Sequence, residues 1–124
     1  MIKNILITIG VFLGIDTIWL GIIARKFYDK YFAPFNRHAY IPAAVLVYLI
    51  LPIGLYFLVL TRNISTPLQA LGWGALYGLV AYGTYDLTNW AVLADWSPIV
   101  VLVDILWGMT ISGVTSMIVF YLTK

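Results

Sequence analysis

Asp16, Asp86 and Asp104 lie inside long apolar stretches of the sequence. A carboxyl group can bind a cation, hold a proton or serve as a general acid or base. At the centre of a membrane helix an aspartate costs at least about 2.5–3.5 kcal/mol, so it needs a partner, a water-filled cavity or a proton. These three aspartates therefore mark the part of the molecule where chemistry is expected.

Each of the three aspartates is followed by a tryptophan three or four residues later, which places both side chains on one face of a helix. The pairs are Asp16 with Trp19, Asp86 with Trp90, and Asp104 with Trp107. An indole N–H group, like the side-chain amide of Asn89, is a donor that could hold an ionised carboxylate in a dry environment. The spacing thus predicts that aromatic and amide groups accompany the carboxyl groups.

The segment 82–90, with the sequence YGTYDLTNW, is the most polar one within an apolar stretch. Tyr82, Asp86 and Asn89 fall on one helical stripe. We expect this stripe to face the interior of a helix bundle. Carboxyl groups that lie close together titrate as a unit, so a shared or transferable proton is natural there.

The composition indicates what kind of fold must position these residues. Of the 124 residues, 63% are hydrophobic and 10% are charged, and the mean hydropathy is +0.98. A soluble domain has roughly 45–50% apolar and about 25% charged residues, so a water-soluble fold is excluded. Apolar stretches at 5–23, 40–60, 68–93 and 99–122 are each long enough to cross a bilayer core of about 30 Å. The sequence predicts an all-α polytopic membrane protein, a bundle of four transmembrane helices in a single domain over residues 1–124.

The expected helices bring the three aspartates to a similar depth. Asp86 and Asp104 lie about nine residues before and after the turn near Asp95, or roughly 13 Å along each helix. Asp16 lies about seven residues, or roughly 10 Å, from the end of its helix. The loops after the first and third of four helices emerge on the same side. We therefore expect all three carboxyl groups in one half of the membrane.

Small residues at four-residue spacing predict which helices approach closely. The pattern occurs at Gly10 and Gly14, at Gly74 and Gly78, and again through Gly108, Ser112 and Ser116. The stretch 40–60 lacks this pattern and carries Pro42 and Pro52. We expect that helix to face lipid, with a kink near Pro52.

The segment between the first two stretches, residues 25–38, mixes four cationic with five aromatic side chains. This mixture is typical of the headgroup region of a bilayer, so membrane lipids are expected partners, with anionic headgroups bound between Arg25 and Arg37. A plain membrane anchor is the simpler interpretation of the same residues. Pro34 is expected to end any helix that continues out of the first span.

Several classes of site and partner are not expected. The sequence has no cysteine, and its single histidine, His38, has no acidic cluster near it, so neither a metal site nor a cofactor is predicted. A net charge of +2 gives no extended basic surface for nucleic acid. The cationic residues are nearly balanced between the two membrane faces, which is compatible with an antiparallel homodimer.

Three segments of the sequence together resemble a known family. They are DTIWLG at 16–21, YGTYDLTN at 82–89 and DILWG at 104–108. Their combination looks like the bacterial membrane family called domain of unknown function 2177 (DUF2177), and the likeness covers nearly the whole chain. The resemblance implies a small inner-membrane protein with several spans and supports treating the three aspartate segments as one site. It implies no reaction.

We interpret the site as one that binds or transports a small cation, a proton-coupled solute or an amphipathic solute. The candidate ligand-binding residues are Asp16, Trp19, Tyr82, Tyr85, Asp86, Asn89, Trp90, Asp104 and Trp107. A membrane-embedded enzyme acting on a lipid or another apolar substrate is an alternative, with two carboxyl groups as general acid and base. A noncatalytic membrane subunit, and a purely structural role in which the aspartates fix the helix register, are also open.

Overall fold

The computed structural model describes residues 1–33 and 40–124. Its helices, in chain order, are α1 (Ile2–Ile18), α2 (Arg25–Tyr31), α3 (Ile41–Leu55), α4 (Pro67–Val92) and α5 (Pro98–Thr123). Five-residue π-helical turns extend α1 over Trp19–Ile23 and α3 over Tyr56–Leu60. No strand occurs in the described ranges, in agreement with the predicted all-α class.

In the described part of the chain, three helical segments are long and apolar enough to cross a membrane. They are Ile2–Ile23, Ile41–Leu60 and Pro98–Thr123. These segments fall on three of the four predicted stretches, which is consistent with the predicted polytopic helical membrane protein. α4 falls on the remaining stretch, and its 26 residues are long enough to span, but it is richer in polar residues. Length alone therefore leaves α4 as a candidate for a fourth span.

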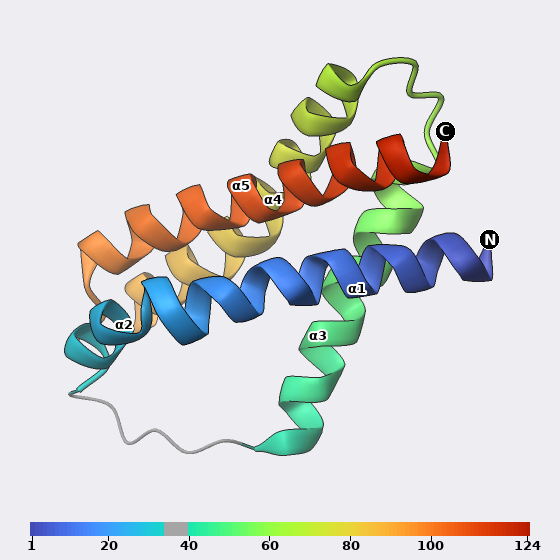
Figure 1. Cartoon of the computed structure of the whole chain (residues 1–124). Helices are drawn as coiled ribbons and strands as arrows, with labels where there is room; N and C mark the ends of the chain where they lie inside the picture. The colour runs from blue at the N-terminus through green and yellow to red at the C-terminus, as the bar shows by residue number, and fades with distance from the viewer. Residues whose placement is uncertain (34–39) are drawn as a thin grey trace.

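α4 and α5 each begin at a hydroxyl residue followed by proline. The Thr66 side chain accepts a hydrogen bond from the Gln69 backbone nitrogen, and the Ser97 side chain accepts one from the Ile99 nitrogen, both at 3.2 Å. Such side chains satisfy N–H groups that the first helical turn leaves without partners, and proline suits this turn because it has no N–H group. The sequence thus fixes where both helices begin, and α5 runs back along α4 (Figure 1).

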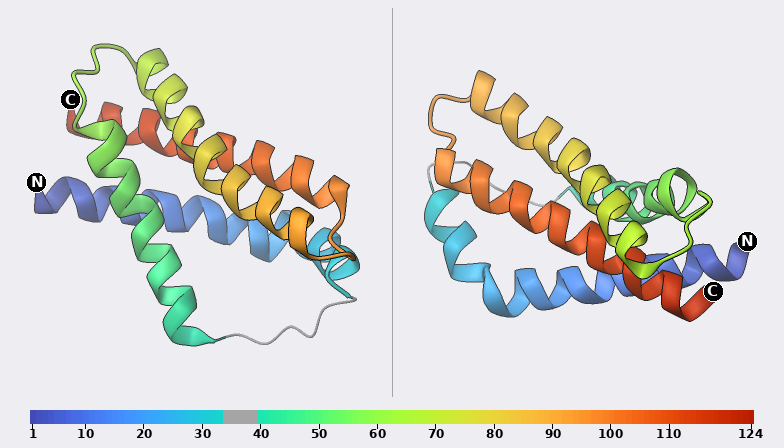
Figure 2. Two further views of the ribbon diagram at one scale, coloured as in Figure 1. Left: turned by 180° about the vertical axis from the view of Figure 1, so that it is seen from behind. Right: turned by 90° about the horizontal axis from the view of Figure 1, so that it is seen from above.

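α4 and α5 make the most extensive helix contact in the described chain (Figure 2). A Cβ atom on Gly74 would lie 2.5 Å from the Ser112 carbonyl oxygen, and one on Gly78 would overlap the carbonyl group of Gly108. Glycine, which has no Cβ atom, lets two helix backbones approach this closely. The small-residue contact predicted for these helices is confirmed.

The small-residue contact predicted for the first helix is wrong. Gly10 and Gly14 lie on an exposed face of α1, and a Cβ atom on either would meet no atom within 4 Å. α1 packs instead through Thr8, Phe12 and Asp16, which are its buried residues. Gly10 and Gly14 on one side of α1, and Thr8, Phe12 and Asp16 on the other, are both spaced by four residues. The side with the larger side chains packs against the other helices.

The segment predicted as a loop over 24–39 contains a short helix. The π-helical turn after α1 ends at Ala24, and α2 follows at once. Ala24 and Tyr28 are buried in one cluster with Val100 at the start of α5, which holds α2 against the bundle. The predicted helix stop and part of the predicted headgroup segment lie outside the described residues, namely Pro34, Arg37 and His38.

α3 crosses the other helices steeply (Figure 1). Its buried residues, Pro52 and Leu55, lie near its carboxyl end, whereas much of its first half is exposed. The Tyr77 hydroxyl of α4 donates a 2.8 Å hydrogen bond to the Leu51 carbonyl and occupies space beside Gly54, where a Cβ atom would lie 2.6 Å from it. The helix changes to π geometry shortly after Pro52, where the sequence predicts an irregularity.

Candidate functional site

The three aspartates come together in the half of the bundle that carries α2 and the turn between α4 and α5. This end lies opposite the two chain termini (Figures 1 and 2). Asp16 comes from α1, Asp86 from α4 and Asp104 from α5. Asp16 is 6% exposed and Asp86 is fully buried. Their grouping follows the depths expected from the sequence.

Asp16 is held by a neighbouring helix. Its Oδ1 atom accepts a hydrogen bond from Nε1 of Trp107 on α5 at 3.2 Å. The ring of Trp107 stacks on that of Trp19, with the centroids 4.3 Å and the planes 10° apart. The two D-x-x-W segments therefore join α1 to α5, and the donor for Asp16 is the tryptophan of the other helix.

Asp104 is held by a tyrosine that the sequence pattern places at the membrane surface. The Tyr28 hydroxyl on α2 donates a hydrogen bond to Oδ1 of Asp104 at 2.8 Å. Burial, followed by the charge of Asp104, raises the pKa of the Tyr28 phenol above its ordinary value. Nothing in the sequence singles out Tyr28, because its basic and aromatic neighbours are those of an ordinary interfacial segment.

We expect Tyr28 to make the protein less stable at alkaline pH. A tyrosine in an unfolded chain has a pKa of about 10, whereas the pKa of Tyr28 in the folded protein is raised. Above about pH 10 the unfolded state loses this proton while the folded state keeps it. The stability that Tyr28 contributes is therefore complete below about pH 10. It is lost as the pH rises toward the pKa that Tyr28 has in the folded protein.

Free energies of unfolding in detergent micelles, measured from neutral to alkaline pH, test this expectation. Tyr28→Phe should lose about 1 kcal/mol at neutral pH with the hydrogen bond to Asp104, and its alkaline decline should be shallower than in the wild-type protein. The exposed Tyr40→Phe is the control and should change neither quantity. An unchanged alkaline slope in Tyr28→Phe would contradict the expectation.

A cavity of about 490 Å³ lies between α1, α3, α4 and α5, beside α2. Six of the nine residues predicted from the sequence line it: Asp16, Trp19, Tyr82, Tyr85, Asp104 and Trp107. The other lining residues are Tyr28, Tyr48, Leu20, Val47, Leu51 and Ala81. No lysine or arginine is among these lining residues, so the cavity is acidic and aromatic in character.

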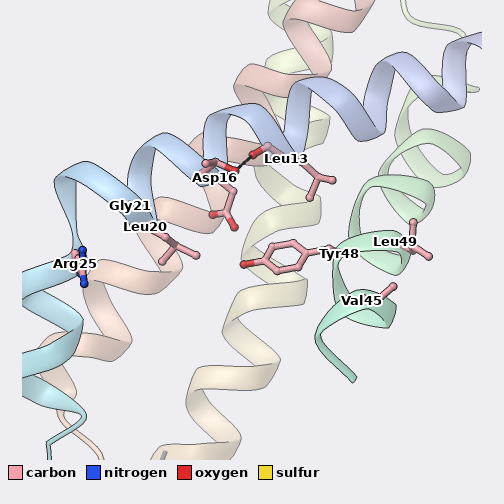
Figure 3. Close-up of a pocket in the computed structure, with 9 residues that line it drawn as sticks. Leu13, Asp16, Leu20, Gly21, Arg25, Val45, Tyr48 and Leu49 are labelled. Carbon is pink, nitrogen blue, oxygen red and sulfur yellow. Dashed lines mark hydrogen bonds between the residues drawn. The ribbon is translucent and has the colours of Figure 1, made fainter. Parts of the chain in front are cut away.

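Tyr48 of α3 lies between this cavity and a groove on the outside of the bundle. Its hydroxyl points toward the Asp16 carboxyl group (Figure 3). Tyr48, Asp16 and Leu20 line both hollows. A depth count could have identified this residue, since Tyr48 lies about eight residues into its stretch, or roughly 12 Å deep, close to the depth of Asp16.

Asp86 lies behind the cavity and does not line it. Its carboxyl group adjoins that of Asp104. When the group is ionised, no donor of a described residue forms a hydrogen bond to either of its oxygens, whereas in its protonated form it can donate a hydrogen bond to Asp104. A buried carboxyl group without donors is costly unless it holds a proton or faces a bound cation. Asp86 is therefore the residue of the site whose burial is hardest to explain by structure alone.

Asn89 and Trp90 do not line the cavity. Trp90 is 48% exposed, and Asn89 lies beside the Tyr85 hydroxyl, farther along α4. α4 and α5 diverge toward the turn that joins them (Figure 2), which carries the last turn of α4 away from the carboxyl groups. A ligand-binding role for these two residues stays a prediction.

The carboxyl groups are spread along the site rather than gathered around one point. Asp86 adjoins Asp104, whereas Asp16 is bonded to Trp107 on another wall. In residues 1–33 and 40–124, no three or more His, Cys, Asp or Glu side chains are grouped so that they could hold a metal ion. The carboxyl groups of Asp16, Asp86 and Asp104 therefore do not form one compact cluster.

Comparison with protein families gives one match over nearly the whole chain. The matching family is described as "Predicted membrane protein (DUF2177)", and the match covers residues 1–121. All nine residues of the predicted site fall within the matched range, so the resemblance read from the three aspartate segments is confirmed. No curated protein and no solved structure matches the chain.

Proposed function

Because the chain belongs to the DUF2177 family of predicted membrane proteins, we propose that it is a four-span bundle of a bacterial inner membrane that binds an organic cation. The membrane location rests on the family and on three apolar helices. One observation carries the proposed function. It is the cavity between α1, α3, α4 and α5, where Asp16 and Asp104 stand among aromatic rings.

α4 is proposed as the fourth span. Its 26 residues extend about 39 Å at 1.5 Å per residue, which exceeds a bilayer core of about 30 Å. It packs along α5, which is apolar enough to cross a membrane. The polar residues Tyr82 and Asp86 face the cavity or the interior, whereas Leu76, Leu79 and Val80 are exposed and suit contact with lipid.

The size and chemistry of the cavity favour an organic cation. A volume of about 490 Å³ falls within the range of roughly 300–1,000 Å³ that small-molecule sites occupy. The charged groups that line it are carboxyl groups, and aromatic rings attract cations by about 0.5–2 kcal/mol at short range. Trp19 and Trp107 stack on each other, so tyrosines supply much of the remaining aromatic surface.

Proton coupling belongs to the same proposal. Asp86 and Asp104 adjoin each other, and a cation bound beside them would displace a proton that the pair shares. Transport would require the cavity to open to each side of the membrane in turn. Four short spans make a thin pathway, so a homodimer is expected, and the loop charges are compatible with an antiparallel pair. The homodimer stays a prediction, which a mass measurement of the protein in detergent would test.

Replacing Asp104 by asparagine is expected to weaken the binding of tetraethylammonium by about tenfold, which corresponds to about 1.4 kcal/mol. The substitution keeps the shape of the side chain and removes its negative charge from the cavity wall. Isothermal titration of the protein in lipid nanodiscs, in the absence of other organic cations, measures the affinity. The expected loss reflects the attraction between the carboxylate and the cation in a water-poor site.

Asp95→Asn is the matched control, because it removes the same charge from the exposed turn between α4 and α5. Its affinity for tetraethylammonium should equal that of the wild-type protein. Equal affinities for Asp95→Asn and Asp104→Asn, or no measurable binding by the wild-type protein, would refute the proposed function.

A further inference from the structure

An open groove of about 670 Å³ lies between α1 and α3 on the outside of the bundle (Figure 3). Its walls are mainly apolar and include Leu13 of α1, Leu20 of the π-helical turn that extends it, and Val45 and Leu49 of α3. Both helices belong to segments that are apolar enough to cross a membrane. The groove therefore opens toward the hydrocarbon chains of the bilayer.

The groove is about as long as one leaflet is thick. From Leu13 to Arg25, both of which line it, the chain advances twelve residues, or at most about 18 Å at the α-helical rise of 1.5 Å per residue, because the π-helical turn Trp19–Ile23 advances less per residue. Half of a hydrocarbon core of about 30 Å is roughly 15 Å. The apolar segment of α1 ends at Ile23, so Arg25 lies at the level of the lipid headgroups when Leu13 lies near the membrane centre.

The headgroup end of the groove is positively charged. α2 carries Arg25, Lys26 and Lys30, and of these Arg25 lines the groove. A guanidinium group binds phosphate through paired, charge-assisted hydrogen bonds, and basic side chains at this level attract anionic lipids. We propose that the groove binds one anionic phospholipid, with its phosphate at Arg25 and an acyl chain that follows α1 into the angle between α1 and α3.

The proposed lipid would lie against the outer wall of the acidic cavity. Asp16, Leu20 and Tyr48 line both the groove and the cavity. The Oδ1 atom of Asp16 accepts a hydrogen bond from Trp107 on the inner side, so this oxygen has a hydrogen-bond donor without the lipid. The proposed lipid and cation sites share this wall and lie on its two sides, so the lipid site is tested with no organic cation present.

Arg25→Gln and Lys26→Gln form a matched test of the headgroup contact. Native mass spectrometry measures the lipid that the protein retains from detergent containing equal amounts of phosphatidylglycerol and phosphatidylcholine. The wild-type protein should retain mainly phosphatidylglycerol, and Arg25→Gln should retain about fivefold less of it. Lys26→Gln removes the same charge next to the groove and should retain nearly as much as the wild type. Equal losses in the two variants would mean a general attraction to surface charge and would overturn the proposal.

Filling the groove tests the acyl-chain contact independently of Arg25. Gly21 lines the groove, and a Cβ atom on it would meet no atom within 4 Å, so Gly21→Phe can place its ring there without disturbing the fold. Gly10→Phe adds the same ring to α1 at an equally open position outside the groove. We expect Gly21→Phe to retain several-fold less phosphatidylglycerol than Gly10→Phe. Equal retention by these two variants, or equal retention of both lipids by the wild type, would refute the lipid site.

Discussion

Gly78→Ala is expected to lower the free energy of unfolding by about 3 kcal/mol or more, although it adds a single methyl group. The new Cβ atom would overlap the Gly108 carbonyl group and lie 2.8 Å from the Met109 nitrogen, so the backbone of α5 would have to move. Over-packing among side chains costs about 1–3 kcal/mol, and a helix backbone yields less readily than a side chain. Circular dichroism during titration with a denaturing detergent measures the loss.

Gly10→Ala is the matched control, since it makes the same change at a helical position with no atom within 4 Å of the new Cβ. Alanine is a better helix former than glycine by about 0.5–1 kcal/mol, so this substitution should leave stability unchanged or raise it. The two substitutions are thus expected to have opposite effects. If Gly78→Ala also stabilises the protein, the close approach of α4 and α5 at Gly78 is wrong.

Hydropathy was sufficient to locate the four long helices and to group the aspartates, but not to find α2. The stretches expected at 68–93 and 99–122 are helical as α4 and α5. A residue count from the turn between them gave Asp86 and Asp104 a common depth, and their side chains adjoin. This reasoning succeeds because each membrane helix advances by the same rise per residue through the same thickness of lipid.

Contacts between helices could not be derived from spacing within one helix. The D-x-x-W spacing places Trp19 beside Asp16 on α1, yet the donor that holds Asp16 is Trp107 of α5. Gly10 and Gly74 are equivalent by their spacing, but Gly74 alone of the two lies against another helix backbone. Spacing shows which residues share a face, whereas the rotation of that face toward a neighbour depends on all the packed side chains.

The contact between Tyr28 and Asp104 depends on a fold-back that the pattern of residues does not reveal. α2 lies outside the apolar segments and reaches the site because Ala24 and Tyr28 are buried against the start of α5. The same aromatic and basic residues would suit a segment lying flat at the membrane surface. Tyr28 differs from its aromatic neighbours in sequence by its burial and not by its residue type. Only the structure therefore identifies it as the hydrogen-bond donor to Asp104.

Asp86→Leu is expected to raise the free energy of unfolding by about 2–3 kcal/mol and to weaken the binding of tetraethylammonium. Asp86 is fully buried, and no donor of a described residue forms a hydrogen bond to either of its carboxyl oxygens. A buried polar group without a partner costs about 1–3 kcal/mol, and more when it is charged, so an apolar side chain of similar size relieves that cost. Titration with a denaturing detergent measures the stability, and calorimetry in nanodiscs measures the affinity.

Asp104→Leu is the comparison that separates a structural from a functional role for Asp86. Asp104 accepts a hydrogen bond from Tyr28, so its loss leaves that hydroxyl without its acceptor and should not stabilise the protein as Asp86→Leu does. A polar contact between membrane helices contributes about 0.6 kcal/mol on average, which is less than the cost of about 2.5–3.5 kcal/mol for an aspartate in a membrane helix. If Asp86 only fixed the helix register, its replacement would lower stability and leave the affinity for tetraethylammonium unchanged. A gain in stability together with a loss of affinity would identify Asp86 as a residue that costs stability and serves ligand binding.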